Sequence, residues 1–259
     1  MTRIVQPVGA LLREWRQRRR LSQLDLASEA EISTRHLSFL ETGRALPSRD
    51  MVLHLSERLE IPLRERNLLL IAAGYAPVFQ ERSLADPELQ AARAAMDLVL
   101  QAHAPNPAIA IDRHWTLVAA NRSVAPLIAG VDPELLKPPV NVLRLSLHPR
   151  GLAPRIVNLA EWRAHLLERL RRQVDVSADA VLVELLKELR GYPAPSQPPH
   201  RPNGAGVVVP FKLHHGDRVL SFLSTTTVFG TPVEITLSEL ALETFFPADA
   251  ETAEAVKLL

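Results

Sequence analysis

The sequence predicts an α+β fold in which an all-helical N-terminal region precedes a mixed α/β region built on an antiparallel sheet. Three observations support this fold class. Residues 1–75 combine closely spaced helix caps with apolar residues at helical spacing. A polar stretch near residues 76–86 and the breaker at His103–Pro107 then interrupt the pattern. From Ala108 onward, short apolar runs with β-branched residues alternate with leucine-rich helical segments.

The composition is that of a globular protein with room for one large or two ordinary domains. Of 259 residues, 47% are apolar and 23% are charged, and none is cysteine, which excludes disulfides and thiolate chemistry. The N-terminus lacks the apolar stretch of a signal peptide, and no segment approaches the ~18 apolar residues of a membrane span, so we expect a cytoplasmic protein. Five arginines between Arg13 and Arg20 suit either a nucleic acid or a solvated helix face.

Caps define five short helices in the N-terminal region. Ser22 and Asp25 form a capping-box pair. Ser33 is an N-cap, and Ile32 and Leu37 on either side of it have the spacing of a hydrophobic staple. We therefore expect helices over Val8–Arg19, from Ser22, from Ser33 to a glycine stop at Gly43, from Ser48, and from Pro62 to Gly74.

Two of these helices are joined by a tight connection around Ala30–Ser33, which makes a helix-turn-helix pattern, although an ordinary small helical bundle gives a similar one. The outward side of the third helix favours the first interpretation. Its side chains that point away from the apolar face are Thr34, Arg35, Ser38 and Phe39. An exposed Phe beside Arg has little use in a plain bundle. In a recognition helix, Arg can bond guanine O6/N7 and Phe can meet a thymine methyl group.

The run LSQLDLASEAEISTRHLSFLETGRALPS resembles the lambda-repressor-like, xenobiotic-response-element class of helix-turn-helix proteins, and the resemblance covers about residues 8–75. It implies that the residues reading bases in the major groove are Thr34, Arg35, Ser38 and Phe39. The residues that it places on the DNA backbone are Gln23, Arg44, Ser48 and Arg49. His36, at the edge of the recognition face, contacts phosphate in one interpretation and is a structural cap in the other. Because this class often carries a polar residue at the position of Phe39, the sequence preference of relatives does not transfer.

The C-terminal region combines strands with helices. Asp112–His114 is a turn between two short strands, Asn121 is a natural N-cap, and Pro193–Pro202 has the composition of an exposed loop. In chain order, we expect a helix over Pro87–Ala102, strands over Ala108–Asp112 and Trp115–Ala119, a helix from Asn121 to Ile128, helices over Asn158–Val174 and Ala178–Leu189, a hairpin of Gly206–His214 with Arg218–Val228, a strand around Pro232–Ile235 and a helix from near Leu237.

Three separated motifs of this region resemble the MmyB-like regulators, namely DRHWTLVAAN (Asp112–Asn121), NVLRLSLHPRG (Asn141–Gly151) and TTTVFGTPVEITLSELALETFFPAD (Thr225–Asp249). Together with the helix-turn-helix run, the resemblance spans nearly the whole chain. It implies a PAS-like domain that holds a fatty-acid-like molecule behind a DNA-binding domain. The resulting domain plan is a helix-turn-helix domain at residues 1–78, a linker and connecting helix at 79–107, and a PAS-like ligand-binding domain at 108–259.

Four residues are candidates for contact with a ligand. Arg113 and Arg144 suit a carboxylate, which a planar guanidinium grips with two hydrogen bonds, but either can be an ordinary surface arginine. Trp115 either lines a pocket or belongs to the core. Asn121 completes the set, although a helix cap explains this residue without a ligand.

Nothing in the sequence predicts catalysis, a metal or a cofactor. His214 and His215 are adjacent and so face opposite sides of a strand, and there is no HExxH, GxSxG, Walker or GxGxxG motif. We expect a sequence-specific transcription regulator that binds double-stranded DNA as a homodimer and responds to a fatty-acid-like ligand. In the alternative, the C-terminal domain holds no small molecule and docks a protein such as a sigma factor or a toxin.

The base-reading assignment is tested at Arg35. We expect Arg35→Ala to cost ~1–3 kcal/mol of specific binding and to relax the preference at one base position, because a bidentate contact to guanine is lost. Gln23→Ala, which removes a contact to phosphate, should weaken binding to all sequences more evenly. Titrations against DNA fragments of varied sequence measure both effects, and an unchanged sequence preference for Arg35→Ala would overturn the assignment.

Overall fold

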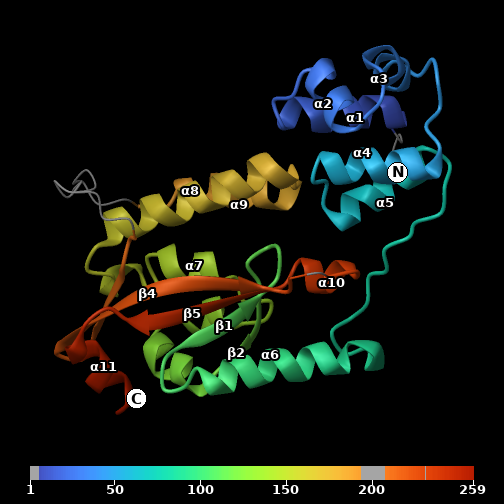
Figure 1. Cartoon of the computed structure of the whole chain (residues 1–259). Coiled ribbons are helices and arrows are strands. Elements are labelled where there is room, and N and C mark those ends of the chain that lie inside the picture. The colour runs from blue at the N-terminus through green and yellow to red at the C-terminus, as the bar shows by residue number, and fades with distance from the viewer. Residues whose placement is uncertain (1–5, 194–207, 231) are drawn as a thin grey trace. The chain divides into compact units, whose positions relative to one another are not determined.

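The computed structural model describes residues 6–193, 208–230 and 232–259. These residues form two compact units, drawn in Figure 1. The first unit contains the described chain up to Arg82 together with Pro232–Ser238, and the second contains the rest. Within the described residues, no helix has both the length and the apolar character that crossing a membrane requires.

The N-terminal part of the first unit is a set of short α-helices. They are α1 (Val8–Arg18), α2 (Gln23–Glu29), α3 (Thr34–Glu41), α4 (Arg49–Arg58) and α5 (Leu63–Ala72). The predicted capping box is confirmed, since Ser22 Oγ accepts the Asp25 N–H at 3.1 Å and the Asp25 carboxylate accepts the Ser22 N–H at 2.8 Å. Ser33 caps α3 as predicted. Pro62 lies at the N-cap of α5 and not at its first helical position, one residue away from the prediction.

These helices pack around completely buried leucines, among them Leu12, Leu26, Leu37 and Leu40. Burial of each such side chain contributes roughly 1.5–3 kcal/mol to folding. Gly9 lets α1 pass close to the end of α3, because a Cβ added there would lie 2.2 Å from the Leu40 carbonyl oxygen. The packing therefore fixes α3 against α1 and α2.

The second unit contains an antiparallel sheet with the strand order β2-β1-β5-β4-β3. Its strands are β1 (Ala108–Ile111), β2 (Leu117–Ala120), β3 (Phe211–His215), β4 (Arg218–Val228) and β5 (Ala241–Pro247). Figure 1 shows helix α6 (Gln90–Ala102) on one side of this sheet and, on the other, α7 (Val142–Leu147), α8 (Leu159–Ser177) and α9 (Ala180–Arg190). A last helix, α11, spans Ala250–Val256. The predicted fold class is confirmed, with a helical helix-turn-helix region before a mixed domain with an antiparallel sheet.

The prediction for the region of the central strand, β5, was wrong. The sequence predicted a strand around Pro232–Ile235 and a helix from near Leu237, whereas the structure has a short helix, α10 (Ile235–Ser238), followed by β5. The segment ALETFFP contains the helix formers Ala, Leu and Glu, which favoured a helix. Hydrogen bonding to β1 on one edge and to β4 on the other overrides this local preference.

The segment between β4 and β5 is anchored in the first unit. Glu234 is buried, and its carboxylate accepts the Arg82 N–H at 2.7 Å and the Leu237 N–H at 2.9 Å. The Ile235 N–H donates to the Gln80 carbonyl at 2.9 Å, and α10 packs against α5. Two neighbouring strands of the sheet are thus joined through a segment of the helix-turn-helix unit.

Asn121 does not cap the segment that follows it, which corrects the predicted role. Arg122–Ile128 forms a 3₁₀-helix without a side-chain cap. The Asn121 amide bonds the backbone of other elements instead. Its Oδ1 accepts the Ala108 N–H at 3.1 Å, and its Nδ2 donates to the carbonyls of Leu100 and Asn106. This residue therefore fastens the end of α6 and the following loop to β1.

Other boundaries differ from the expected ones by a few residues. α8 continues to Ser177 and α9 starts at Ala180, both later than predicted. The β3–β4 hairpin is confirmed, with Gly216 in the left-handed region of its turn, but β3 begins only at Phe211. The parts of the expected elements that lie outside the described residues are 194–202 of the loop and 206–207 of the strand.

Candidate functional site

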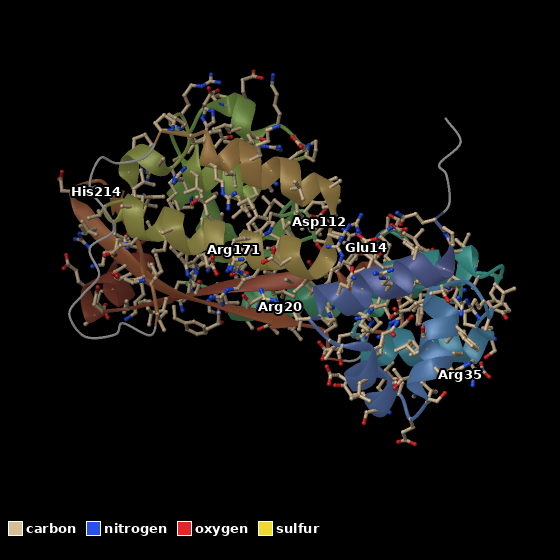
Figure 2. The ribbon with its side chains drawn as sticks, turned by 90° about the horizontal axis from the view of Figure 1, so that it is seen from above. Glu14, Arg20, Arg35, Asp112, Arg171 and His214 are labelled. Carbon is tan, nitrogen blue, oxygen red and sulfur yellow. The ribbon has the colours of Figure 1, made fainter. Side chains whose placement is uncertain are left out.

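The outward side of α3 carries the predicted recognition residues. Leu37 and Leu40 are completely buried, whereas Arg35, labelled in Figure 2, and His36 are exposed. The partly exposed side chains of the helix include Thr34, Ser38 and Phe39. The capping hydroxyl at the start of α3 belongs to Ser33, so the His36 side chain does not have that structural role. α3 therefore presents an apolar face to the core and a polar face outward.

The Phe39 ring lies close to two arginines, Arg35 on α3 and Arg44 just after it. The guanidinium carbon of Arg35 is 5.3 Å from the centre of the Phe39 ring, and that of Arg44 is 5.8 Å from it. A cation above an aromatic ring is attracted by the negative face of the ring. The ring therefore restrains both long side chains on the surface predicted to meet DNA. The i,i+4 spacing of Arg35 and Phe39 was the signal in the sequence for the first of these contacts.

Gln23, predicted to bond a DNA phosphate, also has a partner within the protein. Its Nε2 donates to Glu41 Oε2 at 2.8 Å. The same carboxylate accepts two hydrogen bonds from Arg16, from Nε at 2.6 Å and from Nη2 at 2.9 Å. The hydrogen bond to Glu41 raises the pKa of Arg16 above its ordinary value, although burial opposes the shift. This buried cluster joins α1, α2 and α3 and holds Gln23 at the start of α2.

The three residues predicted to meet the DNA backbone after α3 are all exposed. They are Arg44, Ser48 and Arg49. Ser48 caps α4 through a 3.2 Å hydrogen bond from the Met51 N–H, so the N-terminus of α4 lies beside these residues. Free N–H groups and the positive end of the helix dipole favour a phosphate at such a position.

The second unit contains a cavity of about 280 Å³. Its wall is almost entirely apolar and includes side chains from the sheet, from α7 and from α8. Large members of the wall are Trp115, Trp162, Leu166, Phe211, Phe222 and Phe245. The polar side chains of the described lining are Ser146, Arg169, Ser224 and Glu243. An apolar cavity with a few polar groups is the usual form of a small-molecule site.

One of the four predicted ligand residues, Trp115, lines this cavity, and the other three are not among its lining residues. Arg113 lies within 3.5 Å of the carboxylates of Asp179 and Glu239. Arg144 makes two-point contact with Glu188 at 2.7–3.0 Å, on the surface. The third, Asn121, bonds backbone groups as described above. The structure thus gives both predicted arginines an internal carboxylate partner.

Trp115 is held in an unusual backbone conformation. Its φ is 65°, in the left-handed region, which costs a bulky side chain roughly 1–2 kcal/mol. Its indole N–H donates to Gln173 Oε1 at 2.7 Å, and the Gln173 amide donates to the Arg113 carbonyl, also at 2.7 Å. The ring is therefore fixed against α8 and forms a firm part of the cavity wall.

Arg169 also lines the cavity, although the sequence did not single it out. Its Nη2 bonds Glu243 of β5 and, at 2.9 Å, Thr226 Oγ1 of β4, and its guanidinium carbon lies 4.6 Å from the centre of the Trp115 ring. Burial, together with the charge of Arg169, lowers the pKa of the neighbouring His165 and so favours its neutral form. Nothing in the arginine-rich sequence of α8 distinguishes Arg169 from its neighbours, because only the position of β5 makes it special.

Two family models match the chain. The MmyB-like transcription regulator ligand binding domain matches residues 92–259, and a helix-turn-helix domain matches residues 7–69. The first match covers more than half of the chain and includes every residue that lines the cavity. The second includes the whole of α1, α2, α3 and α4. Among curated proteins, no match was found.

We expect the stacking of two arginines on Phe39 to strengthen the binding of specific DNA. Phe39→Leu keeps an apolar side chain but removes the ring, so Arg35 and Arg44 lose their common support and specific binding should weaken by about 1–2 kcal/mol. Phe39→Tyr keeps the ring and is the control, expected to bind almost as the unchanged protein does. Anisotropy titrations at one salt concentration, with a DNA fragment selected from a random library, measure the difference. Equal binding by both variants would show that the stacking does not matter.

Proposed function

The chain belongs to the MmyB-like transcription regulators, and from this membership we propose that it recognises a specific DNA sequence under the control of a fatty-acid-like amphiphile. The pairing of a helix-turn-helix domain with an MmyB-like ligand-binding domain makes it a DNA-binding transcription regulator. The observation that carries the ligand part of the proposal is the cavity. Its apolar wall suits a hydrocarbon chain, and its charged pair suits a polar end.

In this proposal the regulator acts in the cytoplasm as a homodimer, without catalysis. Two copies of α3 enter successive major grooves about 34–36 Å apart on a roughly palindromic operator. Arg35 and its neighbours on α3 read bases, while Gln23 and the exposed residues around the start of α4 bind phosphates. Two DNA-binding domains are needed because a single short recognition helix makes few base contacts.

The connection between the cavity and the DNA-binding helices runs through the chain itself. Phe222 and Ser224 of β4 and Glu243 and Phe245 of β5 line the cavity. The segment joining these two strands is bonded to Gln80 and Arg82 and packs on α5, as described above. The chain that joins β4 to β5 therefore also belongs to the helix-turn-helix unit. A ligand that fits one arrangement of these strands better than another can influence that unit through this segment. The ligand shifts the equilibrium only by its difference in affinity for the two arrangements.

The ligand part of the proposal is tested by what the purified protein carries and responds to. We expect native mass spectrometry and solvent extraction to find an amphiphile in stoichiometric amount. Adding such a compound to emptied protein should raise its melting temperature by mass action and change its affinity for the selected DNA fragment. A stability response without any change in DNA binding would contradict control by the ligand. No response of either kind would favour a domain that docks a protein partner.

A pair of substitutions on β4 gives this test a matched control. Ser224 lines the cavity, whereas Thr227 is exposed and is not among the lining residues. Ser224→Leu should fill part of the cavity and weaken the response to the amphiphile at least several-fold. Thr227→Leu adds the same apolar group outside the cavity and should leave the response unchanged. Equal effects of the two variants would count against the cavity as the binding site.

The dimer is tested by light scattering coupled to size-exclusion chromatography. We expect the mass of two chains for the protein on its selected DNA fragment, because the operator geometry requires two recognition helices. The full chain free of DNA is the comparison. A mass of one chain both free and on DNA would contradict the proposed dimer.

A further inference from the structure

The wall of the cavity contains a pair of oppositely charged side chains. Arg169 and Glu243 are the charged side chains among the described lining residues, and Glu243 is 4% exposed. Their contact joins α8 to the central strand β5, and the guanidinium lies over the Trp115 ring. The pair is therefore positioned to meet the polar end of a molecule whose apolar part occupies the cavity.

Arg169 has hydrogen-bond donors to spare. Both of its hydrogen bonds leave from Nη2, one to Glu243 Oε1 and one to Thr226 Oγ1. A guanidinium also donates from Nε and Nη1, and in Arg169 these two nitrogens have no hydrogen-bond partner within the described part of the chain. An acceptor on a ligand can take these donors while the contact to Glu243 stays in place.

Glu243 determines which kind of acceptor fits. Its carboxylate already neutralises Arg169 in a wall that is otherwise apolar. A ligand carboxylate on Nε and Nη1 would bring a second negative charge close to that of Glu243. Two carboxylates on one guanidinium repel each other, which disfavours the ionised form of the second. An uncharged acceptor keeps the hydrogen bonds to Arg169 and avoids this repulsion.

We propose that Glu243 makes the cavity selective for amphiphiles with an uncharged, hydrogen-bond-accepting head group, held by Nε and Nη1 of Arg169. An alcohol, an ester, an amide or a carboxylic acid in its protonated form has such a head group. This inference rests on the proposed function, because it requires that the cavity holds an amphiphile. Glu243 is then a specificity-determining residue that excludes ionised head groups, and Arg169 is the residue that binds the head group.

The test compares decan-1-ol with decanoate, which have the same chain length, on the full-length protein at neutral pH. The unchanged protein should bind decan-1-ol more tightly than decanoate. Glu243→Gln keeps an acceptor for Arg169 but removes the negative charge. It should therefore tighten decanoate binding by roughly tenfold or more, the effect of one charge-assisted contact, and change decan-1-ol binding by much less. Displacement of a fluorescent fatty-acyl probe measures both affinities.

The domain offers a matched control in a second Arg–Glu pair. Glu188 bonds Arg144 in the same unit, but neither residue lines the cavity. Glu188→Gln removes an equal charge and should leave the preference for decan-1-ol unchanged. If Glu243→Gln and Glu188→Gln change the ratio of the two affinities alike, the selectivity does not come from Glu243 and the inference fails.

A second measurement uses the unchanged protein and does not depend on whether Glu243→Gln folds. Decanoic acid labelled with ¹³C at its carboxyl carbon has different chemical shifts when protonated and when ionised. The bound molecule should show the protonated shift at neutral pH, where the free acid is ionised. A bound, ionised carboxylate would overturn the inference and leave the proposed function intact. Failure of both decan-1-ol and decanoic acid to bind would overturn both.

Discussion

The second unit depends on a buried carboxylate in its central strand. β5 pairs with β1 on one edge and β4 on the other. Its Glu243 is 4% exposed and has almost no access to water. An unpaired charge in that position would cost several kcal/mol. Arg169 of α8 supplies the counter-charge, and this contact brings α8 over the sheet and over Trp115. The Arg169–Glu243 contact thus contributes to the cavity wall from both α8 and β5.

The first unit uses the same principle. Glu41, at the end of α3, is buried and accepts hydrogen bonds from Arg16 of α1 and Gln23 of α2. Removing one partner of such a cluster lowers the free energy of unfolding by far more than the intact cluster adds to it, because the remaining charge is then buried alone. The cluster therefore specifies how α3 lies against its neighbours more than it adds stability. The outward face of α3 is left free to carry Phe39 and Arg35, and Arg44 contacts the same ring from just after the helix.

The parts of the fold that local chemistry decides were predictable from the sequence. The Ser22 capping box, the Ser33 cap and the β3–β4 turn each depend on residues within a few positions of one another. β5 was not predictable in this way, because its local composition favours a helix and its strand partners are far away in the chain. The position of Arg169 in the cavity wall was not predictable for the same reason. An arginine that lines a cavity cannot be told from a surface arginine until the position of β5 is known.

The long-range pairing that made β5 hard to predict also gives this strand a role in the proposed response to a ligand. A cavity lined only by loops could adjust to a ligand locally, with little effect elsewhere. Here the wall includes β4 and β5, whose hydrogen-bonded register leaves little room for independent movement, and the segment between them is bonded into the helix-turn-helix unit through Glu234 and Ile235. Any change in the spacing of the two strands must be absorbed either in that segment or in the helices that hold it. A stiff sheet beside the cavity is therefore a better transmitter of ligand binding than a flexible one, provided that the ligand distinguishes two arrangements of the strands.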